Sequence, residues 1–406
     1  MNCSYRIIPV YTGDVSGVCS ALYELGGMVV IHDPSGCNST YNTHDETRWY
    51  DKESLIFISG LSERDAILGN DKKLIDDVTD AARQLNPAFI ALTNSPIPFM
   101  SGTDFPAIAH VIEKKTGIPT FFAPANGMHD YTVGAGNAFA QLAGYMNAKE
   151  EVNGKRNLPV SVNILGMTPL DFDAEDSVVV MEQMLRDAGF SMITCLGMGD
   201  TALNWKAASK ADVNLVVSSV GLSLAKKMEK LFKIPYVVGT PIGVFAECVF
   251  ENVRTAYTNR ASRVAYMLDE SGIIGETHVN FPMLESDKSR VIFVGEAVTM
   301  KSLATAFSMQ TGISSGVICP FETYEGLLQD RDLHTQGEEE IENVFSQCGK
   351  GTYIVADPLY KPILPEGVTL IEFSHEAFSG RCFRRMRKQL VGKDSMILKE
   401  MIAAVR

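Results

Sequence analysis

Short runs of consecutive apolar residues alternate along this chain with longer stretches in which apolar positions recur at helical spacing. The run Met28–His32 shows no polar alternation, which is typical of a strand buried on both faces of a parallel sheet. The stretch Asp71–Leu85 instead places Leu74, Ile75 and Val78 on one side, as an amphipathic helix does. Such alternation predicts parallel sheets with helical crossovers. The first set has strands at 28–32, 55–59, 88–93 and 119–123 and helices at 71–85 and 105–116.

The same alternation occurs twice more, and 406 residues exceed what one ordinary core supports. We therefore expect an α/β protein with three Rossmann-like domains, each a mainly parallel sheet flanked by helices, at 1–155, 156–285 and 286–406. A mostly helical stretch at 243–270 is expected to lead into the third domain, and a helix at 381–405 to close the chain. The second set has strands at 158–166, 192–196, 213–218 and 235–239 and helices at 173–188 and 222–232; the third has strands at 290–295, 316–319, 352–356 and 368–373.

The composition, with 46% hydrophobic and 21% charged residues, is typical of a soluble globular protein. A net charge of −13 argues against a nucleic-acid surface, which needs a basic stripe. One basic run, at 381–388, is predicted to be either a solvated helix face or a contact with an acidic partner. Residues 1–10 do not resemble a signal peptide, and no apolar run is long enough to span a membrane, so we expect a cytoplasmic protein without membrane contact.

The eight cysteines are scattered without a Cys-x-x-Cys pair, which argues against a disulfide framework and against a self-contained zinc or ferredoxin site. Cys37 follows the first buried strand, after Pro34 and Gly36 break it, and is expected on a turn at the carboxyl edge of the sheet. Ligands bind at that edge in open α/β folds. A cysteine there is either a metal ligand or a small hydrophobic residue of the core.

Four short motifs occur in a fixed order along the first predicted domain, and this order resembles the nitrogenase component 1 superfamily. That superfamily contains the subunits of the nitrogenase molybdenum–iron protein, their assembly scaffolds, dark-operative protochlorophyllide reductase subunits and the reductive cyclase of coenzyme F430 synthesis. The resemblance covers most of the chain and weakens towards the C-terminus. It implies a divergent nitrogenase-like member with three Rossmann-like domains. The motifs are Gly36-Cys37, Ser62-Glu63-x-Asp65-x-x-x-Gly69, Asn94-Ser95-Pro96 and Gly102-x-Asp104.

The resemblance implies an iron–sulfur cluster, of the 4Fe–4S type, shared between two subunits. Residue-by-residue matching places Gly36 and Cys37 at this cluster, whereas Ser95 stands where many members have a cysteine. Cys19 is either a second ligand or core filler in a helix-like stretch. A homodimer would supply Cys37 and Cys19 twice, and a heterodimer would complete the set from another subunit. The implied metal ligands are thus Cys37 and Cys19, with Gly36, Asn94 and Ser95 as further cofactor-binding residues.

The resemblance also points to catalytic candidates in the other two domains. Ser218 stands where molybdenum nitrogenase has the cysteine that holds the iron–molybdenum cofactor, and Phe383 stands where it has the cofactor histidine. Neither that cofactor nor dinitrogen reduction is therefore expected. His375 is either an ordinary histidine or a group for substrate binding or proton delivery, and it would share a cleft with Ser218 if the three domains converge. His129 is predicted to cap a loop near this cleft.

The function implied is that of an oxidoreductase subunit that takes low-potential electrons from an ATP-dependent iron protein. The chain has no Walker A motif, so ATP hydrolysis would belong to that partner. Electrons would pass through the interfacial cluster to a small-molecule or tetrapyrrole substrate, and the oligomer would be a dimer or tetramer of this chain or of homologous subunits. The alternatives are a non-catalytic scaffold subunit of such a complex and a protein that binds a cofactor or metal chelate.

Overall fold

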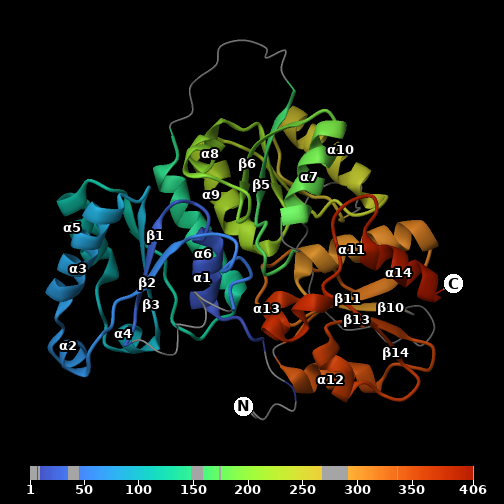
Figure 1. The fold of residues 1–406 in the computed structure, drawn as a ribbon. Coiled ribbons are helices and arrows are strands. Elements are labelled where there is room, and N and C mark those ends of the chain that lie inside the picture. Colours follow the sequence, from blue (N-terminus) through green and yellow to red (C-terminus); the bar gives the residue numbers. More distant parts are fainter. Residues whose placement is uncertain are drawn as a thin grey trace.

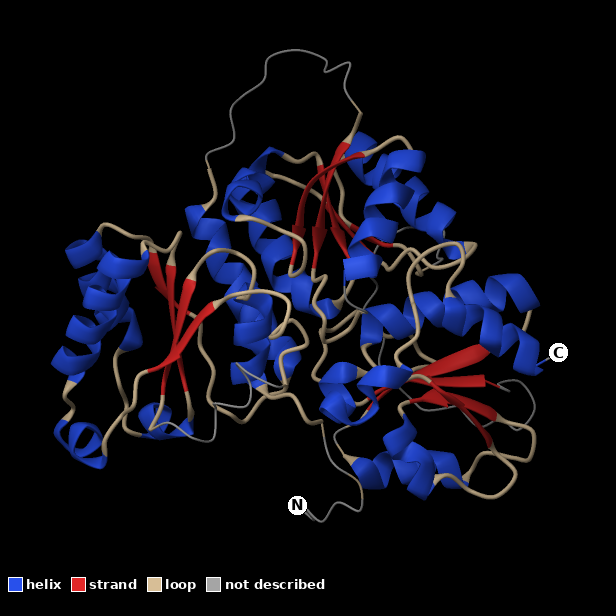
Figure 2. Ribbon diagram, viewed as in Figure 1, coloured by secondary structure: helices blue, strands red, loops and turns tan. Residues whose placement is uncertain are grey.

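The computed structural model describes residue 7 and residues 10–34, 45–147, 159–172, 175–267, 291–335 and 337–405. Within these residues the named strands form three separate sheets, and every pairing between them is parallel (Figure 1). Helices flank each sheet, so the predicted α/β class is confirmed (Figure 2). The domain limits predicted near residues 155 and 285 lie outside the described residues and stay predictions.

The first sheet has the strand order β2-β1-β3-β4. Helices α3 and α5 lie side by side over its outer face, where side chains such as Leu74, Val78 and Ile108 pack on Val30 and Leu92 in an apolar layer of their own (Figure 1). The elements are β1 (Met28–His32), β2 (Leu55–Ile58), α2 (Glu63–Leu68), α3 (Asp71–Leu85), β3 (Ile90–Asn94), α4 (Pro96–Met100), α5 (Phe105–Thr116) and β4 (Thr120–Phe122).

Two helices, α1 (Asp14–Leu22) and α6 (Tyr131–Leu142), pack closely on each other at the centre of the molecule (Figure 1). Glycines make this approach possible. A Cβ atom on Gly134 would lie 1.9 Å from the carbonyl oxygen of Asp14, and one on Gly17 would lie 2.4 Å from that of Tyr131. Because real Cβ contacts are never this short, the backbones could not pack this closely with larger residues at either position.

The second and third sheets repeat the parallel design, with orders β6-β5-β7-β8-β9 and β12-β11-β10-β13-β14. The second sheet and its helices comprise β5 (Ser161–Leu165), α7 (Glu175–Asp187), β6 (Ser191–Leu196), α8 (Ala202–Ala207), β7 (Val213–Val216), α9 (Leu222–Phe232), β8 (Tyr236–Val238), α10 (Phe245–Asn259) and β9 (Arg263–Val264). The third comprises β10 (Val291–Val294), α11 (Ala297–Thr311), β11 (Ser315–Cys319), β12 (Leu333–His334), α12 (Glu338–Ser346), β13 (Tyr353–Ala356), β14 (Thr369–Glu372), α13 (Glu376–Ser379) and α14 (Met396–Val405).

The predicted closing helix at 381–405 is wrong over its first half. Residues 380–386 form a 3₁₀ segment, a loop follows, and only α14 (Met396–Val405) is α-helical. Gly392 interrupts the helical backbone with a φ of +103°, and the Ser395 hydroxyl accepts a hydrogen bond from the amide of Leu398 at the start of α14. The basic run is solvated only in part: Arg381 and Arg385 are exposed, whereas Arg387 donates to the carbonyl oxygens of Pro169 and Phe172.

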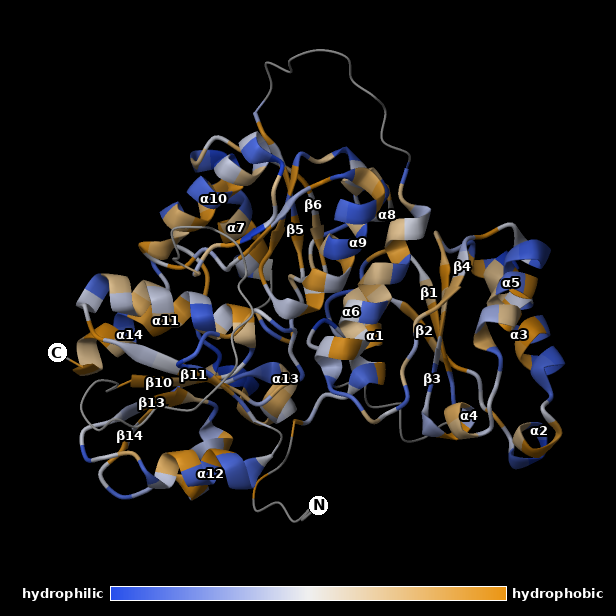
Figure 3. Cartoon of the chain, turned by 180° about the vertical axis from the view of Figure 1, so that it is seen from behind, coloured by the Kyte–Doolittle hydropathy of each residue, from blue (hydrophilic) through white to orange (hydrophobic). Residues whose placement is uncertain are grey.

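Of the stretch 243–270, the structure describes residues 243–267, and these are helical only in α10; β9 then adds an edge strand to the second sheet. β9 and β12 are each two residues long, which is too short to produce a recognisable apolar run in the sequence. Figure 3 shows that the strands of the first two sheets are mostly hydrophobic, as expected for buried sheets. None of the helices in the described part of the chain is long and apolar enough to cross a membrane.

A buried arginine links the first sheet region to the second. The guanidinium of Arg48 lies 2.9 Å from the Glu24 carboxylate and 2.7 Å from that of Glu46. It also donates to the carbonyl oxygens of Ser20 in α1 and Gly197 after β6, each at 2.8 Å. Because its charge and its donors are both matched, this buried cation can be accommodated and fixes the two regions relative to each other.

Trp205 in α8 spans the same boundary. It is fully buried, its Nε1 donates to the carbonyl oxygen of Leu25 at 3.2 Å, and its ring meets that of Phe89 edge-on at 5.7 Å. Leu25 and Phe89 both belong to the first sheet region. The second sheet region thus inserts an aromatic side chain, whose polar atom is hydrogen-bonded, into the first sheet region.

Candidate functional site

Segments that follow strands of the second and third sheets meet at a buried carboxylate, Asp171. Its Oδ2 accepts from the Ser218 hydroxyl at 2.6 Å, and its Oδ1 accepts from the Tyr131 hydroxyl and lies 3.0 Å from His375 Nε2. Asp171 follows β5, Ser218 follows β7 and His375 follows β14, while Tyr131 begins α6. Three donors on one carboxylate offset the cost of burying its charge. We call these four residues the Asp171 cluster.

The hydrogen bond to Asp171 fixes the orientation of His375. The carboxylate can only accept, so Nε2 carries the proton and Nδ1 is left without a hydrogen-bond partner in the described part of the chain. The His375 backbone amide donates to Asp357 Oδ2 at 2.8 Å, and the ring packs edge-on against Phe321, with centroids 5.0 Å apart. A histidine held by a carboxylate, with its other nitrogen free, can bind or exchange a proton at that nitrogen.

Neighbouring acidic groups show how the protein distributes charge around this cluster. Burial, together with the charge of Asp171, raises the pKa of Tyr131 well above its usual value, so its hydroxyl stays a donor. Burial and the same charge raise the pKa of Glu296, although its carboxylate accepts from the amides of Ser219 and Val298, both at 3.0 Å. Burial likewise raises the pKa of Asp357. One buried region therefore holds several carboxylates that compete for protons.

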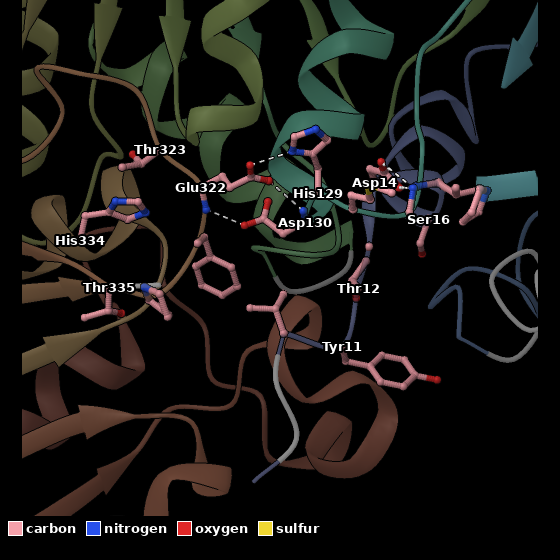
Figure 4. A pocket seen from close by; sticks show the side chains of 18 residues that line it. Tyr11, Thr12, Asp14, Ser16, His129, Asp130, Glu322, Thr323, His334 and Thr335 are labelled. Atoms are coloured by element: carbon pink, nitrogen blue, oxygen red, sulfur yellow. Dashed lines mark hydrogen bonds and ion pairs between the residues drawn. The ribbon is translucent and has the colours of Figure 1, made fainter. Parts of the chain in front are cut away.

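A cavity of about 1030 Å³ lies beside this region, between the start of α1, the loop before α6 and the loop after β11 (Figure 4). Phe321 belongs to both places, since it lines the cavity and packs on His375 and Tyr131. The cavity is therefore separated from the Asp171 cluster by a single aromatic ring. Its size is at the upper end of that of ordinary small-molecule sites.

The wall of this cavity is held together by a reciprocal pair of hydrogen bonds. The Asp130 amide donates to Glu322 Oε2 at 3.0 Å, and the Glu322 amide donates to Asp130 Oδ2 at 2.6 Å (Figure 4). His129 Nδ1 lies 2.8 Å from Glu322 Oε1, and this hydrogen bond raises the pKa of His129, whereas burial raises that of Asp130. His129 thus lines the cavity, and it joins the loop before α6 to the loop after β11.

The structure brings only some of the predicted site residues together. Ser218 and His375 share Asp171, so these two catalytic candidates lie in one cluster. Asn94 and Ser95 end β3 and are buried, the Ser95 hydroxyl has no partner among the described residues, and neither lines the large cavity. Gly36 and Cys37 lie outside the described residues, so their role stays a prediction.

Cys19 lies in the buried core of α1, at 1% exposure. Burial raises the pKa of its thiol to about 12, whereas a metal ligand must be a thiolate. This placement corresponds to the core-filler alternative. No group of three or more His, Cys, Asp or Glu side chains that could hold a metal ion occurs within the described residues. The described residues alone therefore do not fit an iron–sulfur cluster.

Sequence reasoning missed Asp171, Tyr131 and Glu322. Asp171 and Glu322 follow strands of parallel sheets, and this position was the available signal, because the carboxyl edge gathers ligand-binding side chains. The hydrogen bond between Asp171 and His375 could not be predicted from nearby sequence, because the two residues are 204 positions apart. Tyr131 looked like an apolar residue at the start of a helix.

The chain is similar to curated proteins of the nitrogenase type. It is 25% identical over 266 residues to a light-independent protochlorophyllide reductase subunit from Mesostigma viride, covering 62% of this chain and 52% of that protein. It is 26% identical over 225 residues to the nitrogenase molybdenum-iron protein alpha chain of Clostridium pasteurianum, covering 53% and 41%. With the iron-molybdenum cofactor biosynthesis protein NifE of the same organism it shares 27% over 224 residues, covering 53% and 46%. The chain thus spans about half the length of these relatives.

Among solved structures, "Nitrogenase Cp1 at pH 6.5" superposes with a TM-score of 0.68 at 15% identity, covering 100% of this chain and 94% of that one. At this identity the likeness shows a shared fold. The profile of the family described as "Nitrogenase component 1 type Oxidoreductase" matches residues 16–320, which includes most of the first two sheets and the cavity wall up to Pro320. The predicted resemblance is confirmed, and the chain belongs to the nitrogenase component 1 type oxidoreductase family.

Proposed function

We propose that this chain is a subunit of a nitrogenase-like oxidoreductase that takes low-potential electrons from an ATP-dependent iron protein and delivers them to a small-molecule or tetrapyrrole substrate. The observation that carries the proposal is the Asp171 cluster, in which His375 and Ser218 meet at the carboxyl ends of strands from two sheets. That edge is where open α/β folds bind ligands. Membership of an oxidoreductase family supports the class of reaction.

His375 is the proposed proton donor. Reduction by electrons supplied singly requires protons at the substrate, and an imidazole can pass a proton to a bound molecule. Asp171 orients the ring through Nε2, so Nδ1 is the nitrogen that can exchange a proton with a bound molecule. The hydroxyls of Tyr131 and Ser218 donate to Asp171 and hold its carboxylate in place. A substrate would reach His375 from the large cavity by displacing the Phe321 ring.

Electron entry is proposed at an iron–sulfur cluster between this chain and a second copy or a homologous subunit. When bound, such a cluster supplies one-electron transfer. Cys37 is the ligand proposed from this chain, and the remaining ligands would come from the partner subunit. The Ser95 hydroxyl follows β3, which pairs directly with the strand that precedes Cys37, so it is proposed to contact the same group.

The test is anaerobic purification of the full chain with iron and sulfide supplied, followed by visible absorption and iron analysis. We expect the colour of thiolate-bound iron in the parent protein and in Cys19→Ala, and its loss in Cys37→Ala. The iron protein with MgATP should bleach this colour, because reduced clusters absorb less. A protein that stays colourless, alone and with homologous subunits, and that forms no MgATP-dependent complex would refute the proposal.

A second candidate function is a non-catalytic scaffold or cofactor-binding subunit of a nitrogenase-like complex. Serine at positions 95 and 218, where the resemblance leads one to expect cysteines, favours this alternative. The two functions differ in one measurement. A scaffold would form a complex with homologous subunits yet show no change in visible absorption when the iron protein and MgATP are added.

A further inference from the structure

The large cavity carries an uneven set of charges. Its described lining residues include the carboxylates of Asp14, Asp130 and Glu322 and the imidazoles of His129 and His334, but no lysine or arginine. These side chains come from four separate segments of the chain that surround one space (Figure 4). Low-dielectric walls that bear one sign of charge focus the field inside a cleft.

These carboxylates are hydrogen-bonded, but mostly by neutral groups. Asp14 accepts from the backbone amides of Val15 at 2.8 Å, Asn126 at 2.7 Å and Gly127 at 3.0 Å. Amide donors stabilise a carboxylate without cancelling its charge. His129 is the lining group that can offset one charge, because its pKa is raised by Glu322. Burial raises the pKa of Asp130, but the described lining still holds more acidic than basic side chains.

The cations beyond the cavity rim are engaged elsewhere. Arg384 lies past Tyr11, where its Nε donates to Glu376 at 2.9 Å and its Nη2 donates to the carbonyl oxygen of Asp45 at 2.9 Å. Arg381 lies 3.8 Å from the Asp45 carboxylate. Neither arginine lines the cavity.

Two hydroxyls add hydrogen-bonding groups to the cavity wall. Thr12 precedes α1 and Ser16 lies in its first turn; both line the cavity, with 4% and 9% of their surfaces exposed (Figure 4). Within the described part of the chain, no hydrogen bond forms to either hydroxyl. A hydroxyl group both donates and accepts, so these two cavity-lining side chains are available to hydrogen-bond a bound molecule.

We propose that this cavity binds an organic cation and rejects polyanions. Positive charge on the ligand would face Asp130 and Glu322, while its hydrogen-bonding groups would meet Thr12 and Ser16. The inference rests on the proposed function in one respect, namely that the molecule bound here is the substrate that reaches His375. Within that function it disfavours a tetrapyrrole with ionised carboxylate side chains, because like charges would meet in a space of low dielectric.

The test compares two porphyrins of equal ring size and opposite charge, one bearing four N-methylpyridinium groups and the other four sulfonatophenyl groups. Binding to the full chain is followed by quenching of porphyrin fluorescence at fixed ionic strength, because screening would otherwise change both affinities. We expect the cationic porphyrin to bind at least about tenfold more tightly than the anionic one. The assay needs no electrons, so its failure and the failure of the redox proposal are separate results.

Variants distinguish the cavity from the acidic surface as a whole. Glu322→Gln removes one charge at nearly constant volume and should weaken cation binding about three- to tenfold. Glu251→Gln is the control, an exposed acid on α10 outside the cavity, and should leave binding unchanged. Met128→Lys adds a cation at an exposed rim position where folding is not at risk, and should weaken cation binding by a similar factor.

The proposal is overturned if the sulfonated porphyrin binds as tightly as the cationic one. It is also overturned if Glu251→Gln weakens binding as much as Glu322→Gln does, because the cation would then sit on the general acidic surface. Thr12→Val tests the hydroxyl, and we expect it to weaken the binding of spermidine, a protonated amine, about two- to tenfold, as loss of one hydrogen bond does. An unchanged spermidine affinity would remove Thr12 from the site.

Discussion

At the scale of single residues, a buried carboxylate decides the arrangement of the candidate site. Asp171 is fully buried and satisfies donors from three different segments, so each partner depends on it for a hydrogen bond. Removing the Asp171 carboxylate should destabilise the fold more than removing one of its donors, because several buried donors then lose their acceptor at once.

Asp171→Ala should therefore lower the free energy of unfolding by about 3 kcal/mol or more, since each buried donor left unpaired costs about 1–3 kcal/mol. Ser218→Ala is the matched control: Asp171 keeps two donors, and the expected loss is about 1–2 kcal/mol. Urea denaturation followed by circular dichroism measures both. Equal losses in the two variants would show that Asp171 does not organise the cluster.

Asp200 gives a pH-dependent prediction. Burial raises its pKa from 3.8 to about 6, even though it accepts from the Thr194 hydroxyl and from the Thr201 amide at 2.8 Å. A raised pKa means that the folded state prefers the protonated acid. The stability contributed by that form is complete below about pH 4 and is lost as the pH rises through about 6.

Asp200→Asn should therefore stabilise the protein at pH 7 by up to about 3 kcal/mol, the equivalent of the shift at 1.36 kcal/mol per unit. The gain should shrink as the pH falls from 7 to 5. Asp187→Asn, at an exposed position at the end of α7, is the control and should show no such trend. A gain for Asp200→Asn that is independent of pH would contradict the assigned cause.

At the scale of elements, α1 and α6 cross so closely that the contact positions tolerate no side chain larger than that of glycine. Gly134→Ala would force a Cβ to within 1.9 Å of the Asp14 carbonyl oxygen, so the helices must separate. We expect a loss of about 1–3 kcal/mol or more. Gly144→Ala, where an added Cβ meets nothing within 4 Å, should change stability by less than about 1 kcal/mol. Thermal unfolding of the two variants side by side is the measurement.

Two of the motifs on which the family resemblance rests contain residues that cap helices. Ser62 accepts from the Asp65 amide at 3.1 Å and caps α2, and Gly69 closes that helix with a φ of +60°. Asp104 caps α5 by accepting from the Ala107 amide at 3.0 Å. Such caps act within a few residues, which is why sequence reasoning placed these helices well.

Elements with a strong local pattern were predicted closely, and the rest failed for identifiable reasons. β1, α3, α5 and α9 begin and end where the sequence indicated. The closing helix failed because the tertiary contacts of Arg387 and the backbone at Gly392 outweigh helical propensity. The Asp171 cluster was only partly foreseen, since each member is ordinary alone and the contacts join segments from every part of the chain.

At the scale of the whole molecule, the loop before α6 and the loop after β11 are joined by a contact that depends on protonation. Glu322 raises the pKa of His129, and the acids Asp14 and Asp130 also face this histidine. Its stabilisation of the contact is thus complete below its unfolded pKa of about 6.5 and is lost as the pH rises through its higher folded pKa.

Hydrogen-exchange protection of the Glu322 amide, which donates to Asp130, should therefore fall as the pH rises above about 6.5, once intrinsic exchange rates are corrected. His129→Gln should remove this dependence. His110→Gln, at an exposed position on α5, should retain it. A parent protein with constant protection over this range would exclude the histidine as the cause.

The placement of Trp205 allows a separation of the first two sheet regions to be followed by tryptophan fluorescence. The chain has two tryptophans, and Trp49 is 40% exposed whereas Trp205 is sealed between the first two domains. In a Trp49→Phe variant, the emission maximum of Trp205 should lie at short wavelength, as for a buried indole. It should shift to longer wavelength when the first two sheet regions separate and expose Trp205 to water, even if both sheets stay folded. Comparing this shift with far-ultraviolet circular dichroism, which reports secondary structure, would show whether the two sheet regions separate before they unfold.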